Sequence, residues 1–107
     1  MQEYIEVKNT RAIFIKYLGP TNHRGSRIKF QDNYRSGESK TVSYSYLFGN
    51  VQEQALQHLK NSGFNVIGRA TTKGNYIFFV DNWSEEYKYI KEIISTNEVE
   101  KICRNEQ

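Results

Sequence analysis

Cationic side chains gather around a loop of turn-forming residues in the first third of the chain. Residues 16–29 read Lys-Tyr-Leu-Gly-Pro-Thr-Asn-His-Arg-Gly-Ser-Arg-Ile-Lys, so a strand pattern runs into turn formers and a second strand pattern leaves them. Gly25 and Ser26 place backbone N–H groups where little side chain covers them, as in anion-binding loops. The loop is therefore predicted to bind phosphate or an acidic surface. The alternative is a well-formed loop whose cations are only solvated.

The candidate contacts to an anionic partner all come from this basic part of the chain. They are Lys16, His23, Arg24, Arg27, Lys29, Tyr34 and Arg35. Further rings are expected near these cations, namely Tyr17, Phe30, Tyr44 and Tyr46. Proteins that bind single-stranded nucleic acid use such charges to follow the phosphates and such rings to stack on the bases. The alternative is that the tyrosines within residues 42–46 belong to the core.

Charge is distributed unevenly along the chain. Residues 8–40 carry eight lysine and arginine side chains against two acidic ones, whereas residues 84–107 carry four against six. This asymmetry favours an anionic partner for the first part. The overall net charge of +3 is smaller than that of dedicated DNA-binding proteins. The sequence also has no helix-turn-helix, zinc-finger or RNA-recognition signature.

Catalysis has little support in the sequence. His23 belongs to the loop, and His58 belongs to a helix pattern in which a surface or boundary position is expected. Asp81 follows the clearest strand pattern, but the residues after it favour a turn or capping role. Paired carboxylates, a nucleophile elbow and a nucleotide-binding motif are all missing from the sequence. We therefore expect no enzymatic activity and no cofactor.

The single cysteine and the lack of long apolar runs indicate where the chain works. Cys103 cannot form an intrachain disulfide and is typical of a protein from a reducing cytoplasm. One cysteine and two histidines are too few for an ordinary structural zinc site. No apolar run approaches a membrane span, and the start of the chain lacks the features of a signal peptide. The expectation is a cytoplasmic protein without a metal or a membrane contact.

Hydrophobic periodicity predicts elements in the order β-β-β-α-β-β-α. Apolar and β-branched patterns predict strands over residues 11–18, 27–32, 40–47, 64–71 and 76–80. Asn50, with Glu53 three positions later, is typical of a helix start, and Gly63 of a helix end. A second helix is expected from Ser84, with an interruption at Asn97 and a short helical piece after it.

These elements predict an α+β fold. The 107 residues are expected to form a single two-layer domain, with a five-stranded, mostly antiparallel sheet and helices on one of its faces. The other face is expected to carry polar and cationic residues, with an aromatic ring from Tyr17 or Phe79. Residues 97–107 are expected either to pack on the domain or to form a flexible or docking segment. The docking contacts would be Val99, Ile102 and Arg104.

The loop also carries a resemblance. The run Lys16–Asn22, one variable position filled by His23, and the run Arg24–Lys29 resemble the opening motif of a family of small, largely uncharacterised proteins from phages and other mobile elements. The resemblance continues more weakly to the helix that begins near Val51 and covers roughly residues 11–80. Residues 84–107 depart from it. The resemblance implies a genomic context and a fold, but no particular chemistry.

Together these features predict a non-enzymatic accessory protein of a phage or mobile element. Its partner is expected to be nucleic acid, with single-stranded DNA favoured over duplex, or a replication protein such as a polymerase. In the second case it would help the polymerase to prime synthesis or to hold the template. The alternative is an inhibitor that binds a host defence enzyme, of the anti-CRISPR or anti-restriction type. A small hydrolase or transferase is the remaining class.

Overall fold

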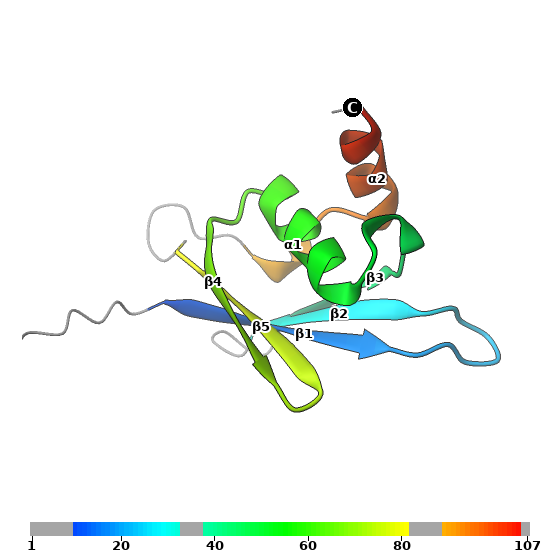
Figure 1. Cartoon of the computed structure of the whole chain (residues 1–107), viewed down its shortest axis with the longest axis horizontal. Helices are drawn as coiled ribbons and strands as arrows, with labels where there is room; N and C mark the ends of the chain where they lie inside the picture. Colours follow the sequence, from blue (N-terminus) through cyan, green and yellow to red (C-terminus); the bar gives the residue numbers. More distant parts are fainter. Residues whose placement is uncertain (1–9, 33–37, 82–88, 106–107) are drawn as a thin grey trace, which may run out of the picture.

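Antiparallel pairing builds the sheet of the computed structural model, which describes residues 10–32, 38–81 and 89–105. The strands are β1 (Arg11–Leu18), β2 (Arg27–Asp32), β3 (Ser39–Ser43), β4 (Val66–Thr72) and β5 (Asn75–Val80). The helices are α1 (Val51–Asn61) and α2 (Thr96–Asn105), with short 3-10 turns η1 (Tyr46–Phe48) and η2 (Ile90–Glu92). This is the predicted α+β class, in one domain (Figure 1).

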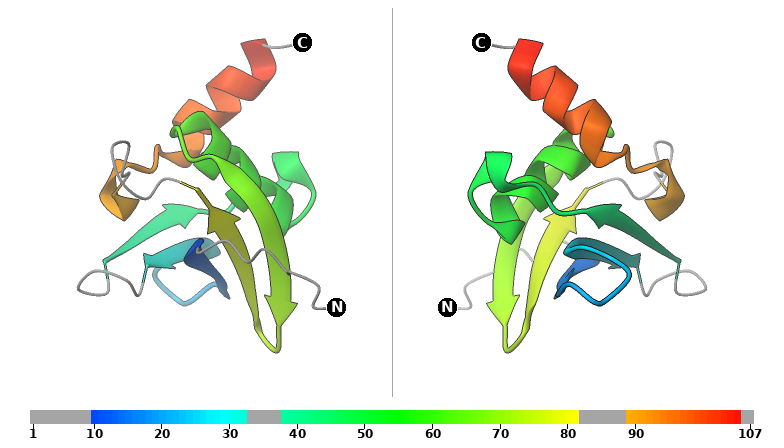
Figure 2. Two further views of the ribbon diagram at one scale, coloured as in Figure 1. Left: turned by 90° about the vertical axis from the view of Figure 1, so that its left-hand side faces the viewer. Right: turned by 90° about the vertical axis from the view of Figure 1, so that its right-hand side faces the viewer.

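The strands lie in the order β3-β2-β1-β5-β4, and every neighbouring pair is antiparallel. The central strand β1 pairs with β2 on one edge and with β5 on the other. The chain passes from β3 through α1 to the far edge strand β4 and returns along β5. Both α-helices lie on the same side of the sheet (Figure 2), as the sequence predicted.

Burial alternates along the central strands and defines two faces of the sheet. In β1 and β2 the residues Ile13, Ile15, Ile28 and Phe30 are fully buried toward the helices. Their neighbours face the opposite side, because successive side chains of a strand point to opposite faces. We call that side the open face. From β1, β2 and β5 it carries Ala12, Phe14, Lys16, Arg27, Lys29, Gln31, Asn75, Ile77 and Phe79.

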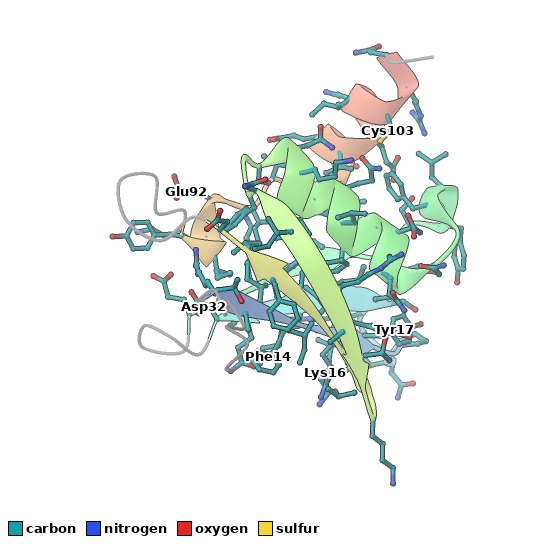
Figure 3. All side chains as sticks on the ribbon, turned by 60° about the vertical axis from the view of Figure 1, so that its left-hand side comes forward. Phe14, Lys16, Tyr17, Asp32, Glu92 and Cys103 are labelled. Atoms are coloured by element: carbon teal, nitrogen blue, oxygen red, sulfur yellow. The ribbon has the colours of Figure 1, made fainter. Side chains whose placement is uncertain are left out.

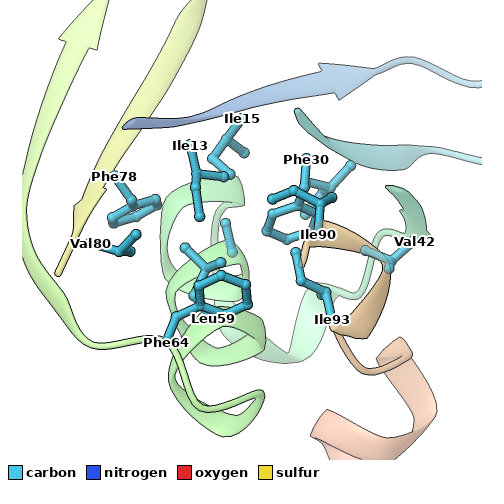
Figure 4. Packing of buried hydrophobic residues seen from close by; sticks show 12 residues of the cluster. Ile13, Ile15, Phe30, Val42, Leu59, Phe64, Phe78, Val80, Ile90 and Ile93 are labelled. Carbon is cyan, nitrogen blue, oxygen red and sulfur yellow. The ribbon is translucent and has the colours of Figure 1, made fainter. Parts of the chain in front are cut away.

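The core lies between the helix-side face of the sheet and a cover made by α1 and η2 (Figure 4). Ala55 and Leu59 of α1 and Ile90 and Ile93 around η2 have no exposed surface. Complete burial of a leucine or isoleucine side chain contributes about 1.5–3 kcal/mol. The core therefore depends on η2 as well as on the longer helix.

Local signals at both ends of α1 explain its bounds. The Asn50 side chain accepts a hydrogen bond from the backbone N–H of Glu53 at 2.9 Å, as an N-cap does. Gly63 has φ +94°, and the N–H of Phe64 donates to the carbonyl of Leu59 at 3.0 Å. This is the hydrogen bond of a Schellman C-cap, which a residue with positive φ makes possible. Both predicted ends of the helix are confirmed.

The third predicted strand is shorter than expected. Residues 40–47 were predicted to be extended, but β3 ends at Ser43 and Tyr46 begins η1. The backbone N–H of Ser45 donates to the side chain of Gln54 in α1 at 2.7 Å, and the Ser45 hydroxyl accepts from the N–H of Leu47. These two bonds replace strand pairing, so the alternation of tyrosine and serine does not continue as a strand.

The C-terminal helix prediction needs correction. The helix was expected to begin at Ser84, and its first residues, 84–88, lie outside the described residues. Ile90–Glu92 forms a 3-10 turn followed by extended backbone, and α2 then runs from Thr96 to Asn105 without a break at Asn97. The three-residue period of a 3-10 turn lets Ile90 and Ile93 both enter the core.

A buried ion pair joins the start of β1 to the end of β2. The Nε atom of Arg11 donates to Oδ2 of Asp32 at 2.8 Å, and both side chains are at most 1% exposed. The Arg11 guanidinium also lies 5.6 Å from the centre of the Phe64 ring. A buried charge is costly unless its partner is present, so each charge of this pair depends on the other.

Replacing Asp32 by Ala should lower the free energy of unfolding by about 3–5 kcal/mol, because the buried Arg11 guanidinium would lose its ion pair with this carboxylate. The double variant Arg11→Met/Asp32→Leu should recover much of that loss. Urea denaturation measures both. The pair of Arg104 and Glu100, which lies at the surface of α2, supplies the control, since Glu100→Ala should cost no more than about 1 kcal/mol. An equally small loss in the Asp32 variant would contradict this account.

Candidate nucleic-acid interface

Two lysines face each other directly on the open face. Lys16 of β1 and Lys29 of β2 are register partners in the antiparallel ladder. Like charges at directly opposed positions destabilise a sheet, because their side chains lie only a few ångströms apart. Lys16 lies on the side of the sheet away from α1, as does Phe14 (Figure 3). The pair is therefore a concentration of positive charge that an anion would stabilise.

A hollow of about 260 Å³ lies beside this lysine pair. It is lined by Phe14, Lys16, Lys29, Gln31 and Asn75, which come from three adjacent strands. The lining contains a flat ring, two cations and two amides, and no carboxylate. Lysine binds phosphate, a ring stacks on a base, and an amide both donates and accepts hydrogen bonds. These are the groups that contact a nucleotide.

An apolar strip continues the open face away from the lysines. Ile77 of β5 is the register partner of Phe14, and Phe79 is the partner of Ala12 and of Gly68. A Cβ atom added at Gly68 would lie 3.6 Å from the Phe79 ring, so this ring covers the glycine. The predicted aromatic contribution of Phe79 to this face is confirmed. The open face thus carries one phenylalanine ring beside the lysine pair, Phe14, and a second one farther along the sheet, Phe79.

The predicted anion contacts divide between the sheet and the loop. Lys16, Arg27 and Lys29 share the open face through the alternation of β1 and β2. His23 and Arg24 are exposed in the connecting loop, where the Thr21 hydroxyl accepts hydrogen bonds from both of their backbone N–H groups. These hydrogen bonds order the turn, so the two exposed side chains have a defined place at one end of the sheet. Tyr34 and Arg35 lie outside the described residues.

Phe30 and Tyr17 do not join the lysines. Phe30, predicted as a ring near the cations, is fully buried and packs edge-to-face against His58 at 5.6 Å. Tyr17 follows Lys16 in β1 and therefore lies on the helix side, contrary to its predicted place on the other face. Its ring meets Tyr44 edge-to-face at 5.6 Å. The cause is the period-two geometry of the strand.

The tyrosine-rich segment 42–46 is neither wholly core nor wholly platform. Val42 is buried, Tyr44 is half-buried, and Tyr46 is 85% exposed. The rings of Tyr44 and Tyr46 meet at 5.2 Å. With Leu47, which is 50% exposed, they leave an apolar patch on the helix side of the molecule. This patch is separated from the lysine pair by the sheet itself.

His58 is fully buried, so the predicted surface or boundary position is wrong. Its Nδ1 lies 2.8 Å from the carbonyl oxygen of Ile94, which only accepts, so Nδ1 carries the proton. Its Nε2 then accepts from the side-chain N–H of Gln54 at 3.2 Å. The same Gln54 amide donates to the carbonyl of Ser43, which also accepts from the hydroxyl of Thr96. This buried polar cluster ties α1 to β3 and to the start of α2.

Burial lowers the pKa of His58, because the charged imidazolium loses solvation inside the core. The hydrogen bond to Ile94 opposes this effect in part, and the nearby charge of Lys40 adds to it. Protonation of Nε2 would also place its hydrogen against the side-chain N–H of Gln54, which disfavours the charged form. His58 is therefore a neutral packing residue with both nitrogens occupied.

The groups considered for catalysis do not converge. His23 lies in the exposed loop and His58 in the core, while Asp81 is exposed and its backbone N–H donates to the carbonyl of Asn65. Within residues 10–32, 38–81 and 89–105, no three His, Cys, Asp or Glu side chains are grouped to hold a metal ion. None of the helices in those same ranges is long and apolar enough to cross a membrane.

The predicted docking residues of the C-terminal segment have different environments. Val99 is fully buried and Ile102 is half-buried, whereas Arg104 is exposed and pairs with Glu100 at 3.4 Å. The thiol of Cys103 lies 3.8 Å from the side-chain oxygen of Gln57, so α2 packs on α1. Only the outer side of α2 is open to a partner, and docking through Ile102 and Arg104 stays a prediction.

No protein-family model, no curated protein and no solved structure matches the chain. The resemblance of residues 16–29 to proteins of phages and mobile elements therefore stays a prediction from the motif.

Sequence reasoning missed two members of the hollow, Phe14 and Asn75. Phe14 had a usable signal, because it stands two positions before Lys16 in a clear strand and must share its face. Asn75 had none, because it reaches the hollow only through the pairing of β5 with β1. Gln31 had the same kind of signal, because it stands two positions after Lys29 in its strand and must share the face of that lysine.

The buried imidazole of His58 predicts a pH-dependent stability. Its folded pKa lies below the ordinary value of 6.5, so the unfolded chain binds the proton more readily. The free energy of unfolding should thus be fully retained above pH 6.5 and fall as the pH drops below it, with a slope of at most about 1.4 kcal/mol per pH unit. Urea titrations between pH 5 and 8 measure this slope.

The variant His58→Asn keeps a donor near the position of Nδ1 but does not titrate, so its fall below pH 6.5 should be shallower. His23→Asn, which removes an exposed imidazole, is the matched control and should retain the fall. Equal slopes in His58→Asn and in the unaltered protein would show that His58 is not the titrating group.

Proposed function

We propose that this protein binds single-stranded nucleic acid on the open face of its sheet, as a non-enzymatic accessory protein of a phage or mobile element. The observation that carries the proposal is the directly opposed pair Lys16–Lys29 beside the ring of Phe14. Phosphates would lie against the lysines and a base against the ring. One concrete role is to help a mobile-element polymerase prime or hold its template.

The shape of the open face favours single strands over duplex. Stacking on a protein ring requires a base that is not already stacked in a helix, and a sheet offers such a platform. Duplex readers commonly insert a helix or a two-stranded ribbon into the major groove. Here α1 packs its buried residues against the opposite side of the sheet, and α2 packs on α1. The open face therefore suits an extended strand.

The loop at the end of the sheet extends the same surface. His23 and Arg24 are exposed there, and Arg27 begins the strand that carries Lys29. A strand of nucleic acid that crosses the lysine pair toward this loop would meet further positive charge. Such contacts release counterions and make the affinity strongly dependent on salt.

A second candidate is the inhibitor of a host defence enzyme. The observation that favours it is the apolar patch of Tyr46 and Leu47, which are 85% and 50% exposed. Tyrosine is enriched in protein–protein interfaces, where its ring supplies contact area and its hydroxyl a hydrogen bond. This patch lies on the helix side, so the double variant Tyr46→Ser/Leu47→Ser should spare nucleic-acid binding under our first proposal.

The variant Lys16→Gln/Lys29→Gln should bind a fluorescent oligo(dT) roughly tenfold or more weakly at 0.1 M salt, because two phosphate contacts are lost. Its slope of log affinity against log salt should be shallower by about 1.4. Fluorescence anisotropy over a salt series measures both. Phe14→Leu should reduce affinity by about 1–3 kcal/mol per stacked base while leaving the salt slope unchanged.

Lys101→Gln/Arg104→Gln is the matched control, because it removes the same charge from the exposed side of α2. If that control weakened binding as much as the open-face variant, the attraction would be a property of net charge alone. The proposed site on the sheet would then be rejected.

A further inference from the structure

A second hollow lies on the opposite side of the sheet, between α1 and the edge strand β4. Its volume is about 460 Å³, within the usual range for small-molecule sites. Its apolar wall comes from Leu56, Phe64, Val66 and Phe78, and two cations, Lys60 and Arg69, stand beside them. No residue lining it belongs to the lysine-pair hollow of the open face.

An irregularity in β4 accounts for this hollow. The register shifts between Val66, which opposes Val80, and Gly68, which opposes Phe79. The extra residue of a bulge delays the next helix-side position, and that position is Arg69, the partner of Phe78. The long side chain of Arg69 extends toward Glu53 of α1, with Nη1 3.6 Å from Oε1. Phe78 itself stays buried, and the half-buried side chains of Leu56 and Val66 supply the accessible apolar part of the lining.

The charges around the hollow are unbalanced. Lys60 is exposed in the last turn of α1, and the Arg69 side chain is 54% exposed. The lining residues include no carboxylate. The contact of Arg69 with Glu53 is long and half-exposed, so it contributes little and leaves the guanidinium able to take a second anion.

We propose that this hollow binds a small amphiphilic anion, with one carboxylate, sulfonate or phosphate group and a single apolar body. The anionic group would lie between Lys60 and Arg69, and the body would lie against Leu56 and Val66. The two cations favour a negatively charged ligand, and the apolar wall disfavours a ligand that carries charge along its whole length. This site goes beyond the proposed binding of nucleic acid and is independent of it.

The probes are decanoate and its neutral counterpart decanol, titrated into the whole protein and followed by amide NMR. Decanoate should bind saturably with one site, shift the amides of Leu56, Val66 and Gly68, and bind at least tenfold more tightly than decanol. The exposed double variant Lys60→Gln/Arg69→Gln should weaken decanoate at least tenfold and leave decanol unchanged. Val66→Phe, which fills the hollow, should weaken both.

Lys16→Gln/Lys29→Gln is the matched control, since it removes the same charge from the other face of the sheet. It should keep decanoate binding while binding oligo(dT) more weakly, whereas Lys60→Gln/Arg69→Gln should weaken decanoate binding and keep that of oligo(dT). Absence of saturable decanoate binding, or equal weakening by the two double variants, would overturn the proposal. Neither result would affect the oligo(dT) measurement, so the two proposals fail separately.

Discussion

Side chains of the central strand β1 alternate between the helix side and the open face, because the strand is held in register by β2 over Ile13–Leu18 and by β5 over Arg11–Ile15. Ile13 and Ile15 supply the centre of the core, and the positions between and after them carry Phe14 and Lys16. A shift of one residue would exchange the two sets and bury a lysine. The same alternation that builds the core therefore places the cations and the ring of the candidate site together.

Buried polar groups hold the rest of the fold around this strand. The pair of Arg11 and Asp32 fixes the end where β1 and β2 meet away from the loop. The Gln54–His58 cluster joins α1 to β3 through the carbonyl of Ser43 and to the segment before α2 through the carbonyl of Ile94. In both places each buried polar group has a partner, and polar groups without one are costly in a core. The open face stays outside these networks and keeps its cations available.

The sequence predicts the elements with strong local signals and misses what depends on distant partners. The bounds of β1 and β2 are predicted to the residue, and so are the two ends of α1, because alternation and capping are local. The third strand is predicted too long, since its end depends on a hydrogen bond that the backbone N–H of Ser45 donates to the side chain of Gln54 in α1. The burial of His58 depends on Ile94, and the place of Asn75 depends on strand pairing. The sequence correctly predicts that Lys16, Arg27 and Lys29 lie near one another, because they belong to two consecutive strands that pair.

The central claim is that the lysine pair and the ring beside it form one nucleic-acid site on the open face. The most direct measurement is an amide NMR titration of the ¹⁵N-labelled protein with oligo(dT). The account predicts saturable shifts at Phe14, Lys16 and Lys29, reaching Asn75 across the sheet, with α2 unaffected. Shifts confined to the Tyr46–Leu47 patch or to α2, or no saturable shift at low salt, would contradict it.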